Sequence, residues 1–87
     1  MTMPHRNPKR DANEARIVDA LRSAGCLVLR SNVFDLIVAR GKRVWLMEVK
    51  AEKNWKFTPE QILRGNQGWP VAVVHTPEQA LKVVGVL

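Results

Sequence analysis

Two segments rich in aliphatic and aromatic residues, 34–40 and 43–50, flank the dipeptide Gly41-Lys42 in the middle of the chain. Valine, isoleucine, phenylalanine and tryptophan are all common in β-strands. A two-residue connection with glycine first suits a type II′ turn, which joins neighbouring antiparallel strands. The sequence therefore predicts a β-hairpin, and the rest of the fold has to be built around it.

The predicted hairpin has a register that brings two acidic residues together. Pairing of Arg40 with Arg43 beside the turn fixes this register. In it, Asp35 lies directly opposite Glu48 on one face, with Cβ atoms about 5 Å apart. Lys50 is two residues beyond Glu48 and shares the face. A slip of one residue would move Glu48 to the other face.

Opposed carboxylates in an apolar strand pair repel each other, and a divalent cation between them removes this repulsion. Oxygen ligands suit Mg²⁺ or Mn²⁺ better than Zn²⁺. Such an ion can polarise a phosphate and acidify a bound water, while Lys50 orients that water or offsets charge in the transition state. In the alternative interpretation, Asp35 is a strand-end residue facing solvent, and Glu48 and Lys50 form an exposed polar stripe.

The remaining segments predict an α/β chain of the α+β type, with a four-stranded mixed sheet flanked by helices. Asp11 and Glu14 resemble a capping box, and Thr-Pro-Glu-Gln occurs twice as a helix start. The predicted elements are a helix over 11–24, strands over 26–30, 34–40 and 43–50, a helix from 58, a strand over 69–75 and a helix from 76. In the order α-β-β-β-α-β-α, the last two strands form a parallel pair. The apolar run 71–74 predicts burial on both faces.

Composition limits the class of protein. Fourteen Lys and Arg against eight Asp and Glu give a net charge of +6, which favours a polyanionic partner such as nucleic acid.

The sequence predicts a flexible basic arm over residues 1–10 and a single domain over 11–87. Cys26 is the one cysteine, so no internal disulfide can form. No segment resembles a signal peptide or membrane span, which predicts a cytoplasmic protein without a membrane partner. His5 and His75 are too isolated to be predicted as metal ligands.

The hairpin residues resemble a known family. Phe34-Asp35-Leu36-Ile37-Val38, a short turn, and Leu46-Met47-Glu48-Val49-Lys50 look like the metal-binding core of the PD-(D/E)XK nucleases. The layout of residues 11–85 is similar to the VRR-NUC branch, in which a helix Glu, an Asp strand, a Glu-Val-Lys strand and a Thr-Pro-x-Gln helix follow in order. The resemblance implies a restriction-endonuclease-like core. One departure is Phe34, which stands where the superfamily name has proline.

The resemblance also implies site residues. The implied catalytic residues are Asp35, Glu48, Lys50, Glu14 and Gln61, and the implied ligands of Mg²⁺ or Mn²⁺ are Asp35, Glu48, Val49 and Glu14. Glu14 could instead serve only in the capping box. Gln61 could likewise be only a helix cap, because Gln79 occupies the same place in the second Thr-Pro-Glu-Gln.

The function implied by the resemblance is that of a metal-dependent DNA endonuclease that hydrolyses phosphodiester bonds. A homodimer acting on branched DNA, such as four-way junctions, without a small-molecule cofactor, is expected, in bacteria or in a phage-infected host. A flap-directed, end-directed or restriction-like nuclease is the alternative within enzymes, although no zinc finger or sequence-reading helix is visible. A basic module that binds nucleic acid without cleaving it is the alternative in another class.

Overall fold

The structure is a computed structural model that describes residues 8–87. Over this range the elements are α1 (Pro8–Ser23), β1 (Leu27–Arg30), β2 (Leu36–Arg40), β3 (Arg43–Val49), α2 (Pro59–Gln67), β4 (Val71–Val74) and α3 (Pro77–Val83). The strands form one sheet in the order β1-β2-β3-β4. The pairs β1–β2 and β2–β3 are antiparallel, and β3–β4 is parallel. The predicted fold class, element order and mixed sheet are confirmed.

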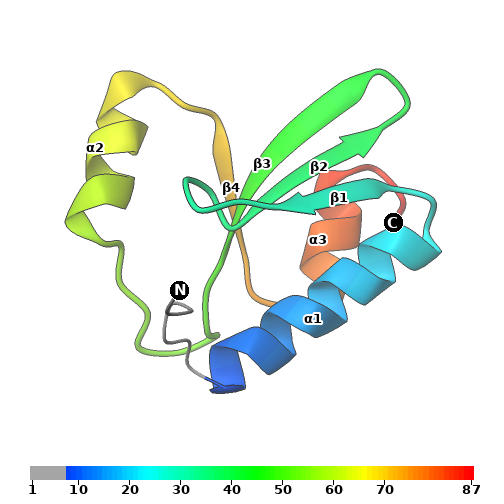
Figure 1. Ribbon diagram of the computed structural model, residues 1–87, viewed down its shortest axis with the longest axis horizontal. Coiled ribbons are helices and arrows are strands. Elements are labelled where there is room, and N and C mark those ends of the chain that lie inside the picture. Colours follow the sequence, from blue (N-terminus) through cyan, green and yellow to red (C-terminus); the bar gives the residue numbers. More distant parts are fainter. Residues whose placement is uncertain (1–7) are drawn as a thin grey trace, which may run out of the picture.

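One face of the sheet carries the hydrophobic core. Helices α1 and α3 pack against each other and against this face (Figure 1). The buried cluster comprises Ile17, Val18, Leu21, Cys26, Val28, Leu36, Val38, Met47, Val49, Val74, Ala80 and Val84. Trp45 packs against it from β3. Burial of aliphatic side chains on this face is the main source of stability for so small a chain.

The opposite face of the sheet is much more open. Helix α2 stands away from the strands (Figure 1), and none of its residues is buried. The apolar run of β4 was predicted to be buried on both faces, and this is wrong: Val74 alone is buried, while the three residues before it are half-buried. The physical reason is that β4 is an edge strand and α2 does not close over it.

The first helix begins at Pro8 rather than at Asp11. Proline suits the first helical turn, because its fixed φ matches the helix and an N–H there has no intrahelical partner. Glu14 therefore lies in the helix interior, and the predicted capping box of Asp11 and Glu14 is wrong. Of the predicted basic arm, residues 1–7 lie outside the described residues and 8–10 belong to α1. None of the helices within residues 8–87 has the length and apolar character needed to cross a lipid bilayer.

The β2–β3 hairpin has the predicted register. Arg40 pairs with Arg43 beside the turn, and the ladder continues to Leu36 opposite Met47. Gly41 has a φ of +63°, in the region that favours glycine, as a two-residue primed turn requires. Both Leu36 and Met47 are fully buried, so the register that forms the core is the one that places Asp35 opposite Glu48.

Gly41→Ala is expected to lower the free energy of unfolding by about 1 kcal/mol or more, because a Cβ at positive φ approaches its own backbone. Gly65→Ala is the matched control: Gly65 is helical, and apart from its chain neighbours and the backbone of its own helix, no atom lies within 4 Å of the Cβ that would be added. The control should be stabilising by up to about 1 kcal/mol. Urea unfolding followed by circular dichroism measures both. Equal effects would contradict a role for the Gly41 conformation.

Candidate active site

The predicted acidic residues lie at the end of the hairpin that is farthest from its turn. Asp35 directly precedes β2, and Glu48 is in β3, one residue before its end. Glu48 is also aligned with Val73 in the parallel pair β3–β4. The site is therefore at the carboxyl ends of two parallel strands, which is the edge where open α/β sheets commonly bind ligands.

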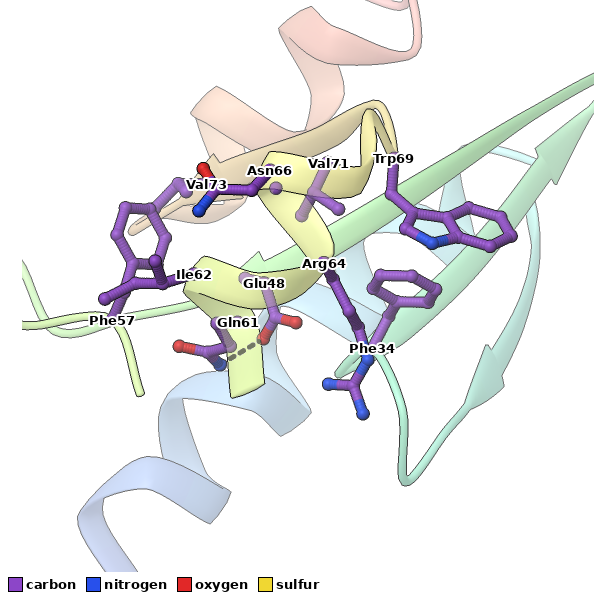
Figure 2. A pocket seen from close by; sticks show the side chains of 11 residues that line it. Phe34, Glu48, Phe57, Gln61, Ile62, Arg64, Asn66, Trp69, Val71 and Val73 are labelled. Carbon is purple, nitrogen blue, oxygen red and sulfur yellow. Dashed lines mark hydrogen bonds between the residues drawn. The ribbon is translucent and has the colours of Figure 1, made fainter. Parts of the chain in front are cut away.

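Glu48 is a buried carboxylate with a defined orientation. Its exposed fraction is 3%, and Oε2 accepts a hydrogen bond of 2.9 Å from Nε2 of Gln61 (Figure 2). Burying a charged group costs free energy unless hydrogen bonds or counter-charges compensate for the lost water. The interpretation of Glu48 as part of an exposed polar stripe is therefore wrong.

Asp35 is half-buried and is held against β3. Its Oδ2 accepts a hydrogen bond of 2.8 Å from the main-chain N–H of Val49. The Val49 side chain is 2% exposed and lies in the core, so only its carbonyl oxygen could serve as a ligand. Asp35 and Glu48 are thus oriented by separate donors, one from the β3 main chain and one from α2.

Gln61 caps α2 and also contacts one of the predicted site residues. The Thr58 N–H donates to Gln61 Oε1 at 3.0 Å, and the Gln61 N–H donates to Thr58 Oγ1 at 3.2 Å, which completes a capping box. The amide nitrogen of the same side chain then donates to Glu48. In the second Thr-Pro-Glu-Gln, Gln79 Oε1 instead accepts from the main-chain N–H of His75 at 2.7 Å. Only the first of the two glutamines reaches a candidate site residue.

Glu14 is buried in α1, with 4% of its surface exposed. Its Oε2 lies 3.6 Å from Nη1 of Arg30, on β1. Within residues 8–87, no three side chains of the His, Cys, Asp and Glu types are grouped closely enough to hold a metal. Glu14 therefore does not complete such a group with Asp35 and Glu48.

The pair Asp35 and Glu48 fits a magnesium-type ion nonetheless. Mg²⁺ keeps several waters and is commonly bound by one or two carboxylates together with substrate phosphates. An ionised carboxylate has about four lone-pair positions, so an orienting N–H donor is compatible with metal binding. These residues, with the Val49 carbonyl, would be the ones to hold the ion.

Lys50 follows β3 directly. Its main-chain N–H donates to the carbonyl oxygen of Val74 at 3.1 Å, which extends the parallel ladder by one residue. Since side chains alternate along a strand, Lys50 is on the same side of the sheet as Glu48. The fold therefore brings Asp35, Glu48 and Gln61 to one end of the open face, and the main chain of Lys50 lies directly beyond Val49.

A cavity of about 270 Å³ lies between α2 and the sheet and is lined by both Glu48 and Gln61 (Figure 2). Arg64 borders it: its Nη1 donates to the Val33 carbonyl at 3.0 Å, and its guanidinium lies 5.8 Å from the centre of the Phe34 ring. Arg64 was not among the predicted site residues, although its spacing of three from Gln61 places both on one side of α2. The cavity adds a cation and an apolar wall to the site.

Gln61→Glu is expected to lower the free energy of unfolding by about 1–3 kcal/mol. Glutamate keeps the acceptor for the Thr58 N–H but cannot donate to Glu48, and it brings a second carboxylate against it. Gln79→Glu is the matched control, because it retains the acceptor for the His75 N–H; its effect should stay within about 0.5 kcal/mol. Urea unfolding at pH 8 in EDTA compares the two. Similar values would show that the Gln61–Glu48 hydrogen bond contributes little.

Comparison with known proteins gave no further identification. No protein-family model, curated protein or solved structure matches this chain. The resemblance to PD-(D/E)XK nucleases therefore stays a prediction.

Proposed function

We propose that this chain is a Mg²⁺- or Mn²⁺-dependent endonuclease that hydrolyses phosphodiester bonds in DNA. The observation that carries the proposal is the buried carboxylate of Glu48, held by Gln61, together with Asp35, whose carboxylate is held by the Val49 N–H next to Glu48 in the chain. A protein that only binds nucleic acid gains nothing from two opposed carboxylates near a polyanion, because they repel it. Branched DNA, such as a four-way junction, is the proposed substrate class.

Each residue has a separate task in this proposal. A divalent cation held by Asp35 and Glu48 would supply Lewis acidity toward the scissile phosphate and a more acidic water. Gln61 and the Val49 N–H keep the two carboxylates in position. Lys50 would offset the negative charge that develops on the phosphate oxygens, or orient the attacking water.

The charge of the protein supports DNA as the partner. The net charge is +6, and the exposed Lys53 and Lys56 lie in the loop that follows Lys50. Contacts between such cations and phosphates release counterions, so binding should weaken steeply as salt rises. These contacts would hold DNA without reading its sequence.

Glu48→Gln is expected to lower cleavage at least about 100-fold while DNA binding is retained. Glutamine keeps the volume and an acceptor for Gln61 but loses the charge that a metal needs. Glu52→Gln, the same change in the exposed loop, is the control and should cleave like the wild type. Labelled junction, flap, duplex and single-stranded DNA are incubated with Mg²⁺, Mn²⁺ or EDTA.

The same assay separates the alternatives. Equal cleavage by Glu48→Gln and the wild type would remove Glu48 from the active site. Cleavage of flaps or ends in preference to junctions would favour the other nuclease classes. Tight, salt-dependent binding with no cleavage in either metal would favour the non-cleaving module.

We further propose a homodimer, built on the apolar side chains of the open sheet face. Two rows cross the strands there, Leu29–Ile37–Leu46 and Leu27–Ala39–Val44. Leu27, Leu29 and Val44 are between 64% and 74% exposed. A contiguous apolar patch of this kind marks an interaction surface. A second copy suits it, because one patch meets its own equivalent across a two-fold axis and a four-way junction has matching symmetry.

Light scattering on the free protein should give about 20 kDa, twice the 9.9 kDa chain. Leu29→Glu is expected to give the mass of one chain with unchanged circular dichroism, because it places a charge in the contact. Leu87→Glu is the control: Leu87 is 64% exposed, similar to Leu29 at 66%, but lies outside the patch, so this variant should remain dimeric. A wild type that is monomeric alone and on a junction would contradict the dimer.

A further inference from the structure

His75 directly follows β4, just as Lys50 directly follows β3. The last pair of the parallel ladder is Val49 with Val74, so His75 and Lys50 each come directly after it. The His75 ring reaches back across the strands: Nδ1 lies 3.1 Å from the Lys50 carbonyl oxygen and 3.0 Å from that of Ala51. A carbonyl oxygen can only accept, so Nδ1 carries the proton and donates to both.

His75 is itself held by three other parts of the chain. Its main-chain N–H donates to Gln79 Oε1 in α3 at 2.7 Å, and its carbonyl oxygen accepts from Nδ2 of Asn13 in α1 at 3.3 Å. The ring lies 5.5 Å from that of Trp55, in the loop after β3. The imidazole is therefore an oriented donor with few alternative positions.

Hydrogen bonds from the end of β4 and from His75 fix the main chain of Lys50. Its N–H is bound to Val74 and its carbonyl oxygen to the His75 ring, so both polar groups are fixed by the end of β4. Beyond this point the chain leaves the sheet, and residues 51–54 are exposed. The lysine side chain has several rotatable bonds, so the anchored backbone decides where its ammonium group can reach.

We propose that His75 is a positioning residue for Lys50. Its Nδ1–H group clamps the main chain at Lys50 and Ala51. The clamp fixes the point from which the Lys50 side chain extends toward the proposed phosphate position near Glu48. His75 acts through this backbone and does not contact DNA or metal. The inference rests on the proposed nuclease function, in which Lys50 is the catalytic cation.

Two substitutions of His75 distinguish the effect of its Nδ1–H donor from the effect of its aromatic ring. His75→Asn places an amide N–H close to the position of Nδ1, whereas His75→Phe keeps an aromatic ring beside Trp55 and removes the donor. We expect kcat of His75→Phe to fall about 10–100-fold, with KM and calorimetric Mn²⁺ affinity within about threefold of the wild type. His75→Asn should recover kcat to within about fivefold. Lys50→Ala removes the cation itself, so its loss of kcat is the largest that a His75 variant is expected to reach.

A second measurement does not depend on cleavage. Amide hydrogen exchange over residues 50–56 should be faster in His75→Phe than in the wild type, and unchanged in His75→Asn, because the clamp limits local opening. Unchanged kcat and exchange in His75→Phe would overturn the proposal. Equal losses of kcat in the two variants, with equal losses in thermal stability, would reduce His75 to a structural role. An inactive wild type with faster exchange in His75→Phe would overturn the nuclease and the catalytic role together, and would leave only the clamp.

Discussion

The pairing of β2 with β3 controls both the stability and the candidate site of this protein. Because side chains alternate along a strand, the register that buries Leu36 and Met47 against the helices also turns Glu48 toward the open face. A slip of one residue would expose core side chains and drive a carboxylate into the apolar interior, at a cost of several kcal/mol. The free energy gained by burying the core therefore also fixes the register, and with it the position of the site.

The two faces of the sheet have different physical tasks. One face is covered by α1 and α3, while α2 stands away from the other (Figure 1). That open face carries the cavity and the acidic residues. Hydrogen bonds from Gln61 to Glu48 and from Arg64 to Val33 link α2 to the rest of the chain. A helix held by polar contacts, without buried residues, is expected to open at lower free energy than the core.

Local sequence signals predicted most of the architecture. The glycine-first turn fixed the hairpin register, and the two Thr-Pro starts gave helices where they were expected. The errors came where tertiary packing overrides a local pattern. The run 71–74 is apolar enough for burial on both faces, but nothing along the chain shows that β4 is an edge strand. Helix α1 begins at Pro8 and not at the predicted Asp11, because proline is as acceptable in the first turn of a helix as an acidic residue is at its cap.

The sequence by itself determined the hairpin register, and with it that Asp35 and Glu48 share one face, because side chains alternate along a strand and the two-residue turn sets the pairing. The same alternation predicts that Lys50 is on that face. Only the tertiary structure decided which donors orient them. Gln61 and His75 reach Glu48 and Lys50 across separations of 13 and 25 residues. These contacts depend on where α2 and β4 come to lie in space. The same tetrapeptide begins both later helices, yet only one glutamine touches the site, because the strand beside each helix is different.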